Sequence, residues 1–107
     1  MAAQETLNEL VNRLNGRPEL MSGLEVRYRL RLSGEGGGNF DLAIGSGQAT
    51  LTEASDQPAS AEVSLSSDDF VSLAGGQTSG MALFMSGRIR VEGDLGTALK
   101  LESLLRS

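Results

Sequence analysis

Cysteine and histidine are both absent from the 107-residue sequence. Without cysteine the chain has neither a disulfide framework nor a thiol nucleophile. Without histidine it lacks Ser-His-Asp and Cys-His catalytic arrangements, the usual zinc ligands and the side chain that normally titrates near neutral pH. We therefore expect a protein that is not an enzyme, and the sequence assigns no catalytic residue, no metal site and no cofactor.

Positive charge and long hydrophobic runs are also scarce. Nine Lys and Arg residues face fourteen Asp and Glu residues, for a net charge of −5 and a pI near 4.6. This balance argues against nucleic acid as a partner and against strong electrostatic capture by anionic membranes. The longest stretch without charge, Phe70 to Gly87, is rich in small polar residues, so we expect no stable membrane insertion. No secretory or peroxisomal signal is visible, which predicts a cytoplasmic location.

The residues that are present predict one α+β domain spanning residues 1–107. Leu7, Leu10, Val11 and Leu14 form an apolar stripe of helical spacing that Gly16 and Pro18 should end. Apolar and polar residues then alternate with period two, as in half-buried strands. These predicted strands cover residues 24–32, 40–44, 49–53 and 61–66. The tract Gly45-Ser46-Gly47 suits a tight hairpin between the second and third strands.

The pattern changes to helical spacing at residue 67. Ser67 is the expected N-cap of a helix that Gly75-Gly76 ends, and a second short helix runs to Ser86 with Gly87 as a left-handed cap. A fifth strand follows over residues 88–92, and Asp94 is positioned to cap a last helix over residues 95–105. The order of elements predicts one largely antiparallel sheet with helices covering one face.

Several polar features have structural explanations that we favour over chemistry. Residues 34–38 are Gly-rich but lead into a strand rather than a helix, which is typical of a hairpin connection and not of a phosphate loop. Asp68 and Asp69 point in different directions on a helix, so helix capping is favoured over acid–base work. Tyr28 is expected in the core.

The alternating arginines Arg27, Arg29 and Arg31 share one face of the first strand. They could bind an anionic head group or a carboxylate, but a solvated outer sheet face explains them as well and is favoured.

Two apolar helical surfaces are of more interest. Met81, Phe84 and Met85 lie at i, i+3 and i+4 and so share a face, and methionine adapts both to core gaps and to varied ligands. The last helix carries an apolar arc too wide for a single contact, which includes Leu95 and Leu99. With only four aromatic residues in the chain, an incompletely filled space between sheet and helices is a reasonable expectation.

The C-terminal part of the sequence resembles the sterol carrier protein 2 (SCP-2) family. The resemblance rests on Ser66-Ser67-Asp68-Asp69-Phe70-Val71-Ser72-Leu73-Ala74-Gly75-Gly76, on Met81-Ala82-Leu83-Phe84-Met85-Ser86-Gly87-Arg88-Ile89-Arg90-Val91-Glu92-Gly93-Asp94, and on the helix that follows. It implies a five-stranded sheet and an apolar tunnel or cavity that holds a fatty acid, an acyl-CoA ester or a sterol. The residues that map onto the cavity-side helices are Phe70, Leu73, Met81, Phe84, Met85, Leu95 and Leu99.

The leading hypothesis is therefore a non-catalytic carrier of a long-chain lipid, present as a monomer or homodimer. The alternative is a protein-interaction or dimerisation module that uses the same apolar helical surface.

Overall fold

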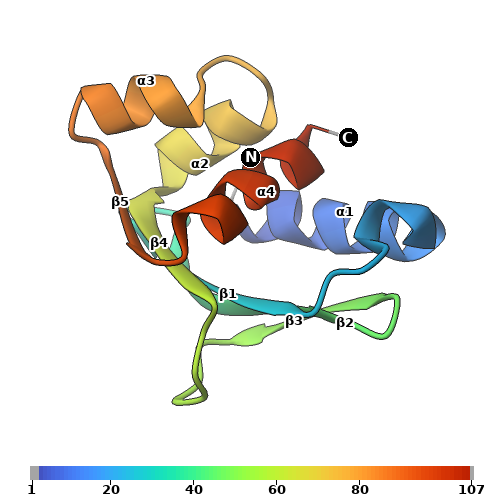
Figure 1. Ribbon diagram of the computed structural model, residues 1–107. Helices are drawn as coiled ribbons and strands as arrows, with labels where there is room; N and C mark the ends of the chain where they lie inside the picture. The colour runs from blue at the N-terminus through green and yellow to red at the C-terminus, as the bar shows by residue number, and fades with distance from the viewer. Residues whose placement is uncertain (1–2, 107) are drawn as a thin grey trace.

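A five-stranded sheet carries the fold, and its helices lie on one face (Figure 1). The computed structural model describes residues 3–106. The strands are β1 (Val26–Ser33), β2 (Gly38–Gly45), β3 (Gln48–Glu53), β4 (Ala61–Ser66) and β5 (Ile89–Gly93). They lie in the order β3-β2-β1-β4-β5, with β1 and β4 parallel and the other neighbours antiparallel. The predicted α+β fold, a largely antiparallel five-stranded sheet with helices on one face, is confirmed.

The helices follow the sequence pattern with two differences. They are α1 (Ala3–Gly16), the 3₁₀ helix η1 (Pro18–Met21), α2 (Ser67–Ala74), α3 (Gly80–Met85) and α4 (Leu95–Leu105). Pro18 does follow the end of α1, but it also begins η1, a helix that the sequence did not predict. The N-cap of α2 is Ser66 and not Ser67: the Ser66 hydroxyl accepts a hydrogen bond from the Asp69 N–H, and Ser67 is buried in the first turn.

The core lies between the helices and the apolar face of the sheet. In register across the central strands, Tyr28 stands opposite Leu42 and Leu30 opposite Phe40, all buried. α1 packs against β3 and α2, and α4 packs against β4, β5 and α2. α3, at the left of the helical layer in Figure 1, packs against β5 at the edge of the sheet.

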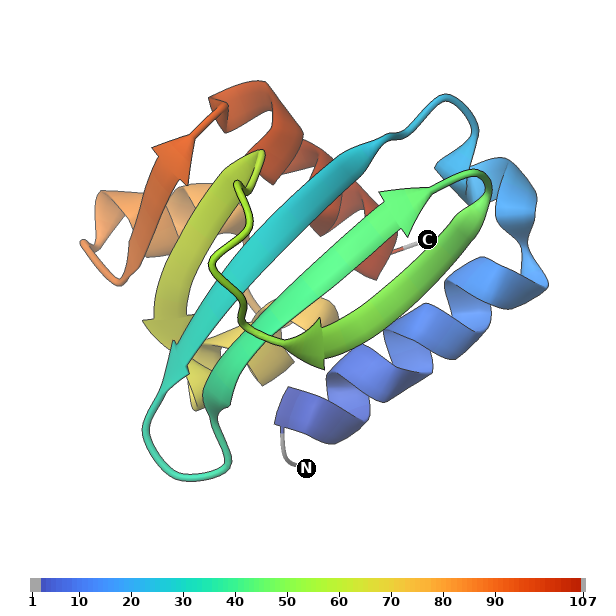
Figure 2. The same ribbon diagram turned by 90° about the horizontal axis from the view of Figure 1, so that it is seen from below.

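On the outer face of the sheet, the face away from the helices, several side chains donate hydrogen bonds to one buried carboxylate. Asp41 is fully buried and accepts hydrogen bonds from Arg29 at 2.9 Å, Arg27 at 3.2 Å and the Ser55 hydroxyl at 2.7 Å. Burial would raise the pKa of Asp41, but the hydrogen bonds from Arg29 and Ser55 outweigh it and lower the pKa to about 2. The connection between β3 and β4 crosses this face (Figure 2), where Arg29 also donates to the Gln57 carbonyl.

Two of the three alternating arginines are therefore less solvated than the sequence suggested. The side chains of Arg27 and Arg29 are 26% and 11% exposed because they close over Asp41, whereas Arg31 is 46% exposed and pairs with Glu62 at 3.2 Å. All three lie on the outer face, as the alternation predicts.

Within residues 3–106, no helix is both long and apolar enough to cross a bilayer.

Candidate functional site

An apolar groove of about 320 Å³ opens between the inner face of β4 and β5 and the helices α2, α3 and α4. Val63, Ile89 and Val91 form its floor from the two strands. The helices supply Leu73, Met81, Phe84, Leu95, Ala98, Leu99 and Leu101. The groove therefore offers a nearly continuous hydrocarbon surface.

Five of the seven residues that the family resemblance singled out meet in this groove: Leu73, Met81, Phe84, Leu95 and Leu99. The last four are between 56% and 68% exposed, so the groove is open to solvent along these side chains and is not closed over as a tunnel. The other two residues are not part of it. Phe70 is 1% exposed and belongs to the core, and Met85 is 77% exposed and lies outside the groove lining.

The wide apolar arc of α4 explains why the groove exists. Leu101, Leu104 and Leu105 are buried in the core, while Leu95 and Leu99 occupy an adjoining part of the helix surface that faces the groove. The arc thus serves two neighbours, as its width predicts. The side chains of α3 divide between core and solvent in the same way: Leu83 is buried, whereas Met81, Phe84 and Met85 are exposed.

Hydrogen bonds fix α4 over the sheet. The buried hydroxyl of Tyr28 donates to the Thr97 carbonyl at 2.8 Å, and burial raises the pKa of Tyr28 to about 12, so this donor stays protonated at neutral pH. The Asp94 carboxylate caps the first turn by accepting from the Thr97 N–H at 2.8 Å. At the other end, Arg13 of α1 donates to the carbonyls of Leu104 and Leu105. The helix that forms one wall of the groove is therefore held at both ends.

One end of the groove is polar. Glu102 lines it, and its Oε1 atom accepts a hydrogen bond from the Gly80 N–H at 3.0 Å. Its other oxygen lies 3.6 Å from a guanidinium nitrogen of Arg106. Sequence reasoning missed Glu102, although its position three residues after Leu99 and seven after Leu95 places it on the same helix face.

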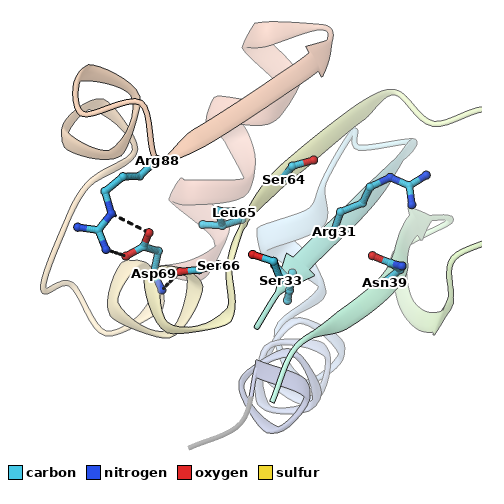
Figure 3. A pocket seen from close by; sticks show the side chains of 9 residues that line it. Arg31, Ser33, Asn39, Ser64, Leu65, Ser66, Asp69 and Arg88 are labelled. Atoms are coloured by element: carbon cyan, nitrogen blue, oxygen red, sulfur yellow. Dashed lines mark hydrogen bonds and ion pairs between the residues drawn. The ribbon is translucent and has the colours of Figure 1, made fainter. Parts of the chain in front are cut away.

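A second hollow, of about 540 Å³, lies at the end of β4 and the start of α2 (Figure 3). Its volume is larger than that of the groove, but most of the residues that line it are polar or charged, and the charged side chains already have partners. Arg88 donates to both oxygens of Asp69 at 3.0 and 2.7 Å, and Arg31, on the other side of the hollow, pairs with Glu62. Asp69 is thus more than the helix-capping residue we expected, because it ties α2 to the start of β5. We assign the candidate site to the apolar groove, which is lined by five of the seven residues predicted from the sequence.

Within the described residues no group of three acidic side chains is arranged to hold a metal ion.

The sheet order, the one-sided helical cover and the apolar groove together define a domain of the sterol carrier protein 2 class.

The comparison with known families agrees with this class. The SCP-2 sterol transfer family matches residues 7–106, and the chain belongs to that family. Among solved structures it shares the fold of a sterol carrier protein domain of Helicoverpa armigera, with a TM-score of 0.75 and 22% identity over 95% of this chain and 84% of that one. A palmitated SCP2-like protein of Aedes aegypti aligns with a TM-score of 0.76 and 15% identity, over 100% of this chain and 96% of the other.

This chain also matches parts of longer proteins. Hydroxysteroid dehydrogenase-like protein 2 of Bos taurus is 34% identical over 106 residues, which is 97% of this chain and 25% of the relative. A sec-alkylsulfatase of Pseudomonas sp. aligns with a TM-score of 0.74 and 18% identity over 90% of this chain but 14% of its own. The chain therefore spans about a quarter of the length of the curated relatives it matches.

Proposed function

We propose that this chain is a non-catalytic lipid-binding module that holds the hydrocarbon part of a long-chain lipid in the groove. The observation that carries the proposal is the apolar groove itself, bordered by Met81, Phe84, Leu95 and Leu99, each more than half exposed. Exposed apolar surface gathered in one place normally marks a binding site. Each methylene removed from water contributes about 0.8 kcal/mol, so a lipid chain can bind there without a charged pocket.

The size of the groove limits how much of a lipid it encloses. Its volume of about 320 Å³ lies at the lower end of the range of roughly 300–1,000 Å³ that is usual for ligand pockets. We therefore propose that part of an acyl chain or sterol-like body lies on the strands β4 and β5, with the rest covered by the exposed side chains of α3 and α4. Fatty acids, acyl-CoA esters and sterol-like lipids are the ligand classes to test.

Membership of the SCP-2 family supports this proposal, since the family is known for binding and transferring lipids. The Aedes aegypti neighbour was determined in a palmitated form, and palmitate is a long-chain lipid. The dehydrogenase-like and sulfatase relatives carry names of enzymes, but this chain matches a quarter or less of their lengths. We propose that it supplies binding and not catalysis. The cytoplasmic location stays a prediction from the sequence.

A competition experiment tests the proposal. The neutral dye Nile red should bind with saturation and be displaced by at least one of dodecanol, palmitate, palmitoyl-CoA and cholesterol. Leu99→Asp places a charge in the groove and should weaken binding by roughly tenfold or more, because the charge must be desolvated. Ser103→Asp adds the same charge to an exposed position of α4 outside the groove and should leave binding unchanged. Absence of saturable binding by all these lipids would overturn the proposal.

A protein-contact role for the same surface is the second candidate, and the exposure of Met85 favours it. Met85 is 77% exposed on α3 but does not line the groove, so lipid in the groove does not explain it. If this surface binds a second copy, light scattering should show a dimer that Met85→Asp converts to a monomer while lipid binding persists. A monomer at high concentration, with and without lipid, would exclude self-association.

A further inference from the structure

A single acidic side chain stands in the otherwise apolar groove. In the described part of the chain, Glu102 is the one ionisable residue among those that line it, and Ser79 and Gly80 complete the polar end. The side chain of Glu102 is 23% exposed, so it is partly shielded from solvent. Two contacts hold its carboxylate in place: the Gly80 N–H at 3.0 Å and the Arg106 guanidinium at 3.6 Å.

The remaining hydrogen-bond acceptor positions of this carboxylate favour one kind of head group. An ionised carboxylate only accepts hydrogen bonds and has about four acceptor positions, so two contacts leave room for a donor from a ligand. A hydroxyl can donate to it, and hydrogen bonds to a charged acceptor are stronger than those between neutral groups. A second carboxylate or a phosphate at the same place would meet a like charge in a shielded environment.

Arg106 does not reverse this preference. It is absent from the groove lining, and its guanidinium donates to the Thr78 carbonyl and lies 3.6 Å from the second oxygen of Glu102. The charge that a ligand in the groove meets first is therefore negative. Ser79 adds no positive charge, and its hydroxyl oxygen caps α3 by accepting from the Ala82 N–H at 3.1 Å.

We infer that the groove selects uncharged lipids with a hydroxyl head group over anionic lipids such as fatty acids and acyl-CoA esters, and that Glu102 determines this selectivity. The inference rests on the proposed lipid-binding function and specifies its ligand class. The hydroxyl donates to the Glu102 carboxylate while the chain lies against Leu95 and Leu99, which occupy the same face of α4.

Dodecanol and dodecanoate test the inference because they share one hydrocarbon chain and differ in the head group. By Nile red displacement at pH 8, where dodecanoate is ionised, dodecanol should bind the native protein roughly tenfold more tightly. Glu102→Gln keeps an oxygen that can accept from the Gly80 N–H but removes the charge. It should tighten dodecanoate binding by roughly fivefold or more, and so reduce the preference.

Two further variants separate charge from folding. Gly80→Ala keeps Glu102 charged, but the added Cβ would overlap its Oε1 atom, so the carboxylate must move and the preference should fall. Glu92→Gln removes one negative charge from β5 at an exposed position outside the groove and should leave the preference unchanged. Circular dichroism of each variant verifies that the fold is intact.

The outcomes distinguish this inference from the function on which it rests. Equal binding of the two lipids, tighter binding of dodecanoate, or a preference that Glu102→Gln leaves unchanged would overturn the selectivity while lipid binding stands. Failure of both lipids, and of the wider set of lipids above, to displace the dye would overturn the lipid-binding function and the selectivity together.

Discussion

Phe70→Ala and Phe84→Ala make the same chemical change on either side of the boundary between core and groove. Phe70 is 1% exposed, so truncation leaves a cavity in the core and should cost about 3–5 kcal/mol. Phe84 is 62% exposed, so only about two-fifths of its surface is shielded in the folded protein. Full burial of a phenylalanine contributes at most about 3 kcal/mol, which puts the loss for Phe84→Ala near 1 kcal/mol.

Thermal unfolding followed by circular dichroism should resolve the difference. For a domain of this size, 1 kcal/mol corresponds to roughly 4–8 °C in Tm, so Phe70→Ala should lower Tm by about 12 °C or more and Phe84→Ala by less than about 8 °C. The order should reverse for lipid binding. Phe84 loses contact area with the ligand, so Nile red affinity should fall by roughly tenfold, whereas Phe70→Ala should leave affinity nearly unchanged below its unfolding temperature.

The reasoning is refuted if the two variants lose equal stability, or if Phe84→Ala binds the dye as tightly as the native protein. The first result would mean that Phe84 is packed in the core. The second would mean that Phe84 does not contact the ligand.

Three other predictions concern the scaffold of the groove. Asp41→Asn should lower the free energy of unfolding by about 2 kcal/mol at pH 7, and the difference should vanish near pH 2. The sign follows because the pKa of Asp41 is lower in the folded state, so its stabilisation is present above pH 4 and is lost as the pH falls through about 2; acid titrations of both proteins by circular dichroism check this. Tyr28→Phe removes the hydrogen bond to Thr97 and should cost about 1 kcal/mol in urea denaturation, together with weaker lipid binding, whereas a purely local role would leave binding unchanged. Ser66→Ala should lower the free energy of unfolding by about 1 kcal/mol, and Ser67→Ala should lower it clearly less. The reverse order would mean that Ser67 is the N-cap, as the sequence suggested.

Periodicity was enough to predict most of the elements. Alternation located the strands and helical spacing located α1, α2 and α4, because both depend on residues close in sequence. Local capping signals also carried over: Asp94 caps α4, and Gly87 has the left-handed φ of 71° expected after α3. Ser66 and Ser67 differ in role although both are good caps, because only backbone direction at the end of β4 decides which hydroxyl reaches the helix.

The candidate site was only partly predictable for the same physical reason. Helical spacing shows which residues share a face, but not whether that face meets the core, a groove or solvent. Phe70 therefore lies in the core, and Met85, at the end of α3, is 77% exposed. Their role in lipid binding stays a prediction without support from the groove geometry.

Partners distant in sequence were the other missing information. Arg13 contacts carbonyls 91 and 92 residues away, and Arg88 contacts Asp69 at a separation of 19 residues. Asp41 reads as the polar member of an alternating strand, yet it is fully buried under two arginines and the connection that crosses the outer face. No local pattern distinguishes a solvated acid from one enclosed by side chains that fold over it.

The groove draws all its lining from residues 63–102, whereas α1, η1 and β1 to β3 contribute none of it. Residues 3–60 thus build the support, and residues 61–106 would determine which ligand binds. Ligand preference can therefore diverge between relatives through changes in the C-terminal part alone. A hybrid that joins residues 3–60 of this chain to the C-terminal part of another family member should bind the ligand of that family member.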